Sequence, residues 1–491
     1  MQYRYQTIID NVSNWAQIVV VHFSLPLNFR YILLSIAVIY ILIYPTRVIC
    51  SIPPHPRIEQ KIKTGKISIP YHLANYSAMK QRGINAGVIY PFTKERHRKQ
   101  NYLSRTFNSL AILIQFSDKP AKVKSKFFDS LLFSNGNNTL RHYYQEISYD
   151  QMDIVTVNFQ NSMGWSDLPQ TYDYYVNGQN GFGAYPRNAQ KMVEDAIEEV
   201  DSLVNFAQYD NDGDGYVDAL FIVHAGSGAE YTGSSNDIWS HQWTTYSPVA
   251  KDGVNIYSYT TEPEYWISPG DMTCGVYAHE IAHAIFGLPD LYDYNKDSKG
   301  LGRWSLMASG SWNGNLGDSP AHPDPWSRVQ MGFISPIVIT SDLIDNEFPP
   351  VEDSAMIFKY IPDQNKINEY FLLENRQKTG FDKQLRGEGL LIYHIDENQP
   401  DNCNQWYPEH TDYGNYKVAL EQADGLWNLE HNNNAGDAGD PYPGISNNTI
   451  FNGASNPNSE NYNQDTTNLS IVNILQSNKN ILASINIQRP S

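Results

Sequence analysis

The chain has 491 residues, of which 41% are hydrophobic, and a formal net charge of −18 at pH 7. At roughly 100–200 residues per domain, this length allows two or three domains plus processing segments. The apolar content is too high for a globally disordered chain. A strongly acidic surface repels phosphate backbones, so the composition argues against nucleic acid as a partner.

An apolar run occupies residues 31–44, with Arg30 before it and Arg47 after it. As a helix it would span about 21 Å, which is short of a hydrocarbon core of about 30 Å. The length therefore predicts a signal peptide within residues 1–50, cleaved before Ser51. The alternative is a retained membrane anchor with the catalytic region outside, and only then would the membrane be a partner.

Residues 51–105 are polar, basic and weakly patterned, whereas the rest of the chain carries the acidity. Such a charge asymmetry is typical of a segment with a separate role, so we predict a pro-segment or linker here. The basic cluster at residues 96–99 (RHRK) is either an accessible site for trypsin-like processing or a solvated loop.

Buried elements can be predicted in the region that follows, residues 106–345. Residues 110–116 (LAILIQF) and 218–225 (DALFIVHA) are apolar runs typical of buried strands. Residues 188–200 place their apolar side chains on one helical face. A second helix is predicted over residues 275–286. We expect this region to form the catalytic domain.

After about residue 345, short strand candidates alternate with turns rich in Gly, Asn, Asp and Pro. The strand candidates are residues 355–361, 370–374, 389–395, 417–420 and 481–487. This pattern predicts a mostly β C-terminal domain over residues 346–491, a sandwich or a similar architecture.

The sequence HEIAH at residues 279–283 is the strongest chemical signal in the chain. On a helix, His279 and His283 lie on one face, one turn apart, and can bind one zinc ion. Glu280 can accept a proton from a zinc-bound water as the water attacks a carbonyl group. The alternative is an ordinary helix that carries two histidines without a metal.

The residues after this motif predict how a third ligand reaches the metal. The sequence GLP at residues 287–289 must end the helix. The chain then turns, and Asp290 can return as the third protein ligand, with Asp293 as the second candidate. Met307 lies in a turn of small residues, and a methionine turn beneath the metal is a feature of metzincins.

Nine stretches of the chain resemble the M6, or immune inhibitor A-like, metallopeptidase family. They are NTLRHYYQEISY (138–149), DNDGDGYVDALFIVHAGSGAE (210–230), IWSHQW (238–243), HEIAHAIFGLPDLYD (279–293), GRWSLMASGSW (302–312), EYFLLENRQKTGFD (369–382), GEGLLIYHID (387–396), EQADG (421–425) and GDAGDPYPG (436–444). The resemblance covers roughly residues 108–450. It is specific, because the blocks fall in order across both predicted domains.

The resemblance implies a secreted zinc endopeptidase made as a precursor, with an α+β, metzincin-like catalytic domain whose twisted sheet lies above the zinc helix. It carries over His279, His283 and Asp290 as zinc ligands, Glu280 as general base and Met307 as the methionine turn. Three residues separate the second histidine from the following glycine, where the family has two. The extra residue shifts Asp290 by about 100° on a helix unless a bulge or an early helix end absorbs it.

Residues 210–218 (DNDGDGYVD) supply oxygen atoms at alternate positions, as the first nine positions of an EF-hand-type loop do. The candidate calcium ligands are Asp210, Asp212, Asp214 and Asp218. The alternative is an Asp/Gly-rich turn before a strand. GDAGDP at residues 436–441 is a weaker calcium candidate.

We assign no role to four further polar residues near the matching blocks, which are Glu230, His241, His322 and His394. The chain has three cysteines. If Cys50 leaves with the signal peptide, Cys274 and Cys403 either pair or stay free.

We therefore expect a secreted enzyme that hydrolyses internal peptide bonds of proteins or peptides, with zinc as cofactor and calcium as a candidate second ion. One alternative is a catalytically narrow or inactive binding protein on the peptidase scaffold. The intact His279, Glu280 and His283 argue against inactivity. Another alternative is a zinc hydrolase that acts on amides of glycans or lipids.

Overall fold

The computed structural model describes residues 51–75, 79, 106–157, 164–412 and 414–487. All of them belong to one compact unit, Arg47–Ser491. The predictions for residues 1–50 and for the basic cluster at 96–99 lie outside the described residues. Within the described part of the chain, no helix is both long and apolar enough to cross a bilayer.

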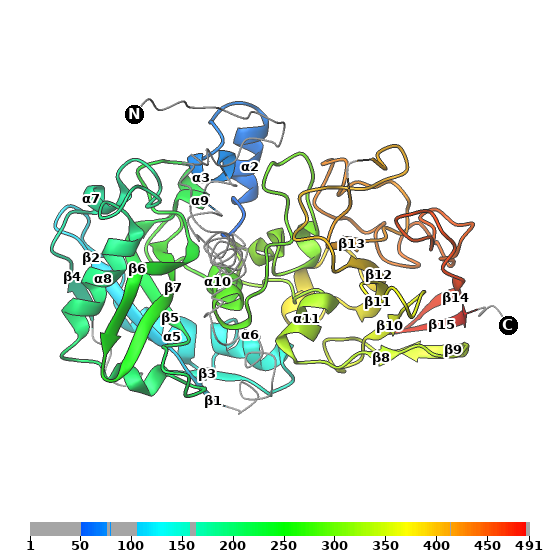
Figure 1. Ribbon diagram of the computed structural model, residues 1–491, viewed down its shortest axis with the longest axis horizontal. Coiled ribbons are helices and arrows are strands. Elements are labelled where there is room, and N and C mark those ends of the chain that lie inside the picture. Colours follow the sequence, from blue (N-terminus) through cyan, green and yellow to red (C-terminus); the bar gives the residue numbers. More distant parts are fainter. Residues whose placement is uncertain (1–50, 76–78, 80–105, 158–163, 413, 488–491) are drawn as a thin grey trace, which may run out of the picture. The chain divides into compact units, whose positions relative to one another are not determined.

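A five-stranded sheet with the order β4-β2-β5-β7-β6 organises residues 106–345, the predicted catalytic region (Figure 1). Its strands are β2 (Leu110–Gln115), β4 (Trp165–Asp167), β5 (Leu220–Ser227), β6 (His241–Lys251) and β7 (Val254–Tyr265). The first four strands in this order run parallel, and β6 pairs antiparallel with β7 at the edge. The strands predicted at residues 110–116 and 218–225 are β2 and β5. A separate parallel pair joins β1 (Thr106–Asn108) to β3 (Asp153–Val155).

Two long helices pack on this sheet. Helix α8 (Ala189–Val200) contacts β2, β4 and β6, and its cap residue Asn188 accepts a hydrogen bond from the Lys191 amide. Helix α10 (Cys274–Phe286) contacts β6 and β7 on its sheet side, and α6 and the 3₁₀ turn η3 elsewhere. Because neighbours surround α10, almost all of its residues are buried. Both helices were predicted from the sequence.

Shorter elements complete the catalytic region. The helices are α5 (Lys126–Phe133), α6 (Leu140–Ile147), α7 (Tyr172–Val176), α9 (Ala229–Thr232) and α11 (Pro325–Met331). The 3₁₀ turns are η1 (Phe206–Tyr209), η2 (Gly302–Trp304) and η3 (Ser309–Trp312). Before β1, residues 51–75 form α2 (Pro56–Lys63) and α3 (Tyr71–Ala74), and α2 contacts α9. This stretch is therefore more ordered than its weak sequence pattern predicted.

The C-terminal region contains two further sheets, with the orders β13-β12-β11-β10-β8 and β14-β15-β9. Their strands are β8 (Ile337–Val338), β9 (Leu343–Phe348), β10 (Phe358–Tyr360), β11 (Glu369–Arg376), β12 (Gly389–Asp396), β13 (Val418–Leu420), β14 (Leu469–Ser477) and β15 (Asn480–Ile487). A short 3₁₀ turn, η4 (Gly380–Gln384), lies between β11 and β12. The five predicted strands correspond to β10, β11, β12, β13 and β15, whereas β8, β9 and β14 were missed.

Strand β11 shows how the C-terminal region packs. Tyr370 and Leu372 belong to the same hydrophobic core as the catalytic region, and Phe371 and Leu373 belong to a second core with β14 and β15. Successive side chains of a strand point to opposite faces, so this sheet is buried on both sides. The mixture of helices and sheets confirms the α+β class. The domain boundaries at residues 50, 105 and 345 stay predictions.

Candidate metal centre

Helix α10 ends at a glycine that turns the chain back toward the motif. Gly287 has a φ of 63°, in the left-handed region that glycine adopts without strain, and its amide donates to the carbonyl oxygen of His283 at 3.0 Å. Helix α10 continues to Phe286 before this turn, so the helix does not end early and the extra residue of the motif lies in its last turn. The turn then directs Asp290 to the histidines.

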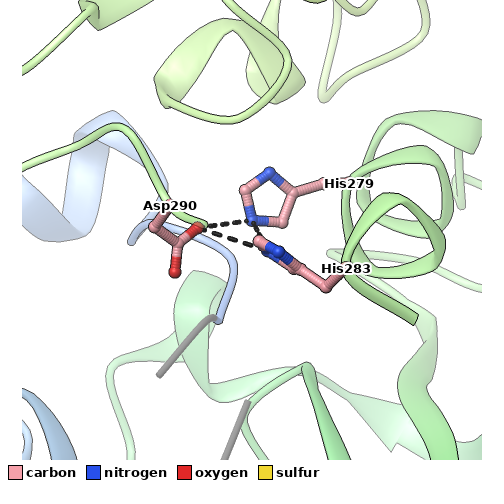
Figure 2. A group of neighbouring side chains, drawn as sticks. All are labelled: His279, His283 and Asp290. Atoms are coloured by element: carbon pink, nitrogen blue, oxygen red, sulfur yellow. Dashed lines mark hydrogen bonds and ion pairs between the residues drawn. The ribbon is translucent and has the colours of Figure 1, made fainter. Parts of the chain in front are cut away.

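Three buried side chains converge at this point (Figure 2). Asp290 Oδ1 lies 3.0 Å from His279 Nε2 and 3.3 Å from His283 Nε2, and the two Nε2 atoms are 3.1 Å apart. Ligands about 2.0–2.1 Å from a zinc ion would be about 3.3 Å apart in a tetrahedral arrangement. This donor set therefore fits zinc. Asp293 lies outside the group, and its carboxylate accepts hydrogen bonds from the amide and hydroxyl of Ser298.

The second polar atom of each of these three side chains has a hydrogen-bond partner in the protein. His279 Nδ1 lies 2.8 Å from the carbonyl oxygen of Leu306, and His283 Nδ1 lies 2.6 Å from that of Leu288. Carbonyl partners keep a proton on each Nδ1, so the Nε2 lone pairs face the centre. Asp290 Oδ2 accepts a hydrogen bond from the hydroxyl of Tyr294 at 2.6 Å. All three side chains are thus oriented before a metal binds.

Glu280 is fully buried beside this group. Burial raises the pKa of its carboxyl well above the usual range, and the nearby carboxylates of Asp290 and Glu262 raise it further. Burial would also raise the pKa of Asp290, but His283 and His279 outweigh that effect and lower the pKa to about 2. The two acids therefore differ: the histidines lower the pKa of Asp290, whereas burial and the neighbouring carboxylates raise the pKa of Glu280.

The loop that contains Met307 connects directly to the centre. Met307 is buried, and its carbonyl oxygen accepts a hydrogen bond from the Leu291 amide at 2.8 Å. The preceding carbonyl, of Leu306, is the partner of His279 Nδ1. Leu306 thus orients the predicted ligand His279, and Met307 holds Leu291, the residue that follows the predicted ligand Asp290.

An N-terminal stretch, residues 51–55, lies in the centre, and we call it the blocking segment. The Ser51 amide donates to Asp290 Oδ2 at 2.8 Å, and the Ile52 amide donates to Glu280 Oε1 at 2.7 Å. Ser51 also forms an antiparallel bridge with His241, the first residue of edge strand β6. The segment thus contacts both a predicted ligand and the predicted base.

Side chains of the catalytic region bind the carbonyl groups of the blocking segment. The indole of Trp239 donates to the carbonyl oxygen of Ile52 at 3.0 Å, and the indole of Trp312 to that of Pro53 at 2.8 Å. The hydroxyl of Tyr292 donates to the carbonyl oxygen of Ser51 at 2.6 Å. These contacts recognise main-chain groups and do not depend on the side chains of the segment.

Sequence reasoning missed Trp239, Tyr292, Tyr294 and Trp312. All but Tyr294 lie inside the stretches that resemble the M6 family, and Tyr294 follows one directly. Aromatic residues with a hydrogen-bonding group, placed beside a metal motif, were the available signal.

The structure also places the four polar residues to which the sequence analysis assigned no role. The Glu230 carbonyl accepts the His55 amide at 2.9 Å, and burial raises the pKa of the Glu230 carboxyl to about 7. Burial lowers the pKa of His241, the bridge partner of Ser51, to about 4. His322 contacts Glu146 at 2.7 Å. His394 lies in the C-terminal sheet.

The predicted calcium loop brings together three of its four candidate ligands. One oxygen atom from each of Asp210, Asp212 and Asp218 lies within 4.8 Å of the others, and Asp214 is not part of this group. Asp210 already accepts hydrogen bonds from the amides of Gly213 at 2.8 Å and Gly215 at 3.0 Å. Calcium at this loop stays a prediction.

Cys274 and Cys403 are both free thiols. Of the two outcomes that the sequence left open, the structure shows the unpaired one.

Residues 101–333 match the catalytic domain of immune inhibitor A peptidase M6. The pre-pro-metalloprotease PrtV of Vibrio cholerae serotype O1 (strain M66-2) is 28% identical over 275 residues, which are 46% of this chain and 29% of that protein. Immune inhibitor A of Bacillus thuringiensis subsp. alesti is 31% identical over 227 residues, 39% of this chain and 31% of that protein. The matched part spans less than a third of each relative. Over residues 101–333, the chain thus matches the catalytic domain of the immune inhibitor A peptidase M6 family.

Proposed function

We propose that this protein is a secreted, zinc-dependent endopeptidase of metzincin-like architecture that hydrolyses internal peptide bonds. One observation carries the proposal: two imidazoles and a carboxylate converge on one buried point, at distances that suit zinc, beside Glu280. The position of Met307 in the loop that supports His279 agrees with a methionine turn. Secretion follows from the predicted signal peptide.

When bound, a zinc ion supplies a Lewis acid that polarises the scissile carbonyl and makes a water molecule more acidic. His279, His283 and Asp290 would hold it. Glu280 takes the proton of the attacking water and delivers it to the leaving amine.

The contacts of the blocking segment indicate how a substrate main chain would lie. Edge strand β6 offers backbone groups to an antiparallel strand, as the bridge between Ser51 and His241 does. Trp239 and Trp312 would donate to substrate carbonyl groups as they do to those of the blocking segment. Recognition of main-chain groups favours a peptide over a glycan or lipid amide.

The same contacts support the pro-segment prediction for residues 51–105. The blocking segment contacts Asp290 and Glu280, so a substrate cannot occupy that place at the same time. We propose that the precursor is inactive until this stretch is removed or displaced.

The test is casein hydrolysis by the processed protein, with the zinc content measured in parallel. We expect one zinc ion per chain, loss of cleavage when a chelator removes it, and recovery when zinc is restored. If zinc binds but casein and a peptide library stay intact, the inactive or narrow binding protein becomes the better account. Cleavage that persists without metal would contradict the proposal.

A further inference from the structure

The peptide bond between Ser51 and Ile52 has both of its polar groups bound by side chains of the candidate centre. Its carbonyl oxygen accepts a hydrogen bond from the hydroxyl of Tyr292 at 2.6 Å, and its N–H group donates to Glu280 Oε1 at 2.7 Å. The amide of Ser51, one peptide bond earlier, donates to Asp290 Oδ2 at 2.8 Å. One peptide unit of the blocking segment therefore lies between a tyrosine hydroxyl and the predicted general base, beside a predicted zinc ligand.

Hydrolysis of a peptide bond makes opposite demands at the two ends of that bond. When water attacks the carbonyl carbon, the C=O double bond opens and negative charge develops on the oxygen. The C–N bond then breaks, and the nitrogen leaves as an amine after it receives the proton that the base took from the water. In the blocking segment, Glu280 contacts the nitrogen end of the peptide unit and Tyr292 contacts the oxygen end.

We propose that Tyr292 is a further catalytic residue, whose hydroxyl donates a hydrogen bond to the oxyanion that forms from the scissile carbonyl group. The assignment rests on the proposed endopeptidase function and on a substrate main chain lying where the blocking segment lies. A hydrogen bond to an oxyanion is stronger than one to a neutral carbonyl oxygen. The same donor therefore stabilises the transition state more than the bound substrate, and this difference accelerates the reaction.

The surroundings of the Tyr292 side chain orient its hydroxyl and strengthen it as a donor. The ring is buried and packs against the ring of Tyr294, with the two centroids 4.9 Å apart. The ammonium group of Lys296 lies 4.2 Å from the centre of the Tyr292 ring. A cation this close draws electron density toward the ring face, which makes the hydroxyl proton more positive and the hydroxyl a better donor.

The backbone at Tyr292 is held from two sides. The amide of the preceding residue, Leu291, donates to the carbonyl oxygen of Met307 at 2.8 Å, and the Leu291 carbonyl accepts from the Leu301 amide at 2.9 Å. Gly300 permits this close approach, because a Cβ there would lie 2.7 Å from the Cα of Tyr292. The hydroxyl is thus carried by a fixed stretch of chain, as a preorganised oxyanion donor requires.

Tyr294 supplies a matched control, because the same chemical group two residues further on binds a different acceptor. Its hydroxyl donates to Asp290 Oδ2 at 2.6 Å, whereas the hydroxyl of Tyr292 contacts the carbonyl oxygen and the hydroxyl of Ser51. Tyr294→Phe should therefore weaken zinc binding by about 10- to 100-fold, the range for a group that orients a ligand. Tyr292→Phe should leave zinc affinity unchanged.

Steady-state kinetics on a peptide substrate, with the processed wild type and Tyr292→Phe at equal zinc content, measures the catalytic role. We expect kcat to fall by about 10²–10³-fold, the range for a lost oxyanion donor. KM should rise by about 10-fold at most, since the hydrogen bond to the neutral carbonyl of the bound substrate is weak. A change in kcat that exceeds the change in KM distinguishes stabilisation of the oxyanion from simple substrate binding.

A readout without turnover is the affinity for a phosphinic peptide, in which an anionic tetrahedral phosphinate replaces the scissile bond. Calorimetry should show that Tyr292→Phe weakens this binding by about 10- to 100-fold, as expected for a hydrogen bond to a charged group. The neutral peptide of residues 51–66 should lose less affinity than the phosphinic peptide does.

The outcomes separate the role of Tyr292 from the proposed function itself. Equal kcat in wild type and Tyr292→Phe, or equal affinity of both for the phosphinic peptide, would overturn the assignment and leave the endopeptidase function standing. Loss of zinc from Tyr292→Phe would also overturn it, because the tyrosine would then support the metal. A wild type that holds zinc but cleaves no peptide would contradict the proposed function, and the role of Tyr292 with it.

Discussion

The metal centre at α10 can be compared with an acidic cluster formed by Asp424, Asp437 and Asp440 in the stretch after β13. At the metal centre, Asp290 lies between two imidazoles, and a tyrosine hydroxyl or a backbone carbonyl holds the far atom of each ligand. In the acidic cluster, three carboxylates meet with no ion-pair partner among the residues that the structure describes. Asp440 Oδ1 is buried without a hydrogen-bond donor, and so is Asp290 Oδ1 at the metal centre. The comparison teaches that the orientation of side chains and the type of donor atom are separate properties: hydrogen bonds orient the side chains of both groups, but only the first group adds imidazole nitrogens to its carboxylate.

A matched pair of substitutions tests which acid completes the metal centre. Asp290→Asn removes a charged ligand, and we expect zinc affinity to fall by more than about 100-fold, beyond the range of outer-sphere changes. Asp293→Asn changes a buried acid three residues further on that lies outside the cluster, and zinc should be retained. Zinc content after dialysis against a weak chelator measures both. Loss of zinc from Asp293→Asn alone would contradict the geometry.

The second largest expected effect concerns inhibition by the blocking segment. A synthetic peptide of residues 51–66 should inhibit the processed enzyme competitively. Proline in place of Ile52 removes the amide that donates to Glu280, so inhibition should weaken by about 10- to 100-fold, as expected for a hydrogen bond to a charged group.

The control for that experiment is a peptide with valine at residue 52, which keeps the amide and a β-branched side chain. It should inhibit nearly as well as the natural sequence. If the proline and valine peptides inhibit equally, the contact between Ile52 and Glu280 does not contribute to binding.

A third buried group, around His394, sharpens the comparison, because here a side chain supplies the positive charge. Its ring nitrogens lie 3.0 Å from Glu369 and 3.4 Å from Glu421. Burial lowers the pKa of His394, but the hydrogen bonds to the two glutamates outweigh it and raise the pKa above its usual value. A histidine whose pKa is higher in the folded state adds stability below its unfolded pKa and loses it as the pH rises through its folded pKa.

His394→Gln should therefore cost about 1–3 kcal/mol in the free energy of unfolding at pH 6 and less at alkaline pH. Denaturant unfolding of both proteins from pH 6 to pH 9 measures this difference. A cost that stays constant over the whole range would indicate that the role of His394 is packing against its aromatic neighbours and not charge.

The zinc motif could be predicted because its chemistry is local. His279 and His283 are one helical turn apart, and Gly287 ends the helix within the same stretch of sequence. The sequence left Asp290 and Asp293 as alternatives, since the position of a carboxylate after a turn depends on backbone angles. Only the structure shows that Asp290 faces the imidazoles while Asp293 binds Ser298.

The rest of the site could not be predicted because it comes from distant parts of the chain. Ser51 and Asp290 are 239 residues apart, and Trp239 and Ile52 are 187 apart. Periodicity found β2, β5, α8 and five C-terminal strands (β10, β11, β12, β13 and β15), whose apolar residues are continuous or regularly spaced. It missed β6, which has a mixed pattern of buried and exposed residues and gains its pairing from β7.

The most direct test of the account compares the processed, zinc-loaded wild type with Glu280→Gln at equal zinc content. The substitution keeps the shape of the side chain and removes its ability to take a proton. We expect casein hydrolysis to fall by about 10²–10⁴-fold, the range for a lost general base, while zinc stays bound. Equal cleavage by the two proteins, with equal zinc, would contradict the assignment of this centre as the catalytic site.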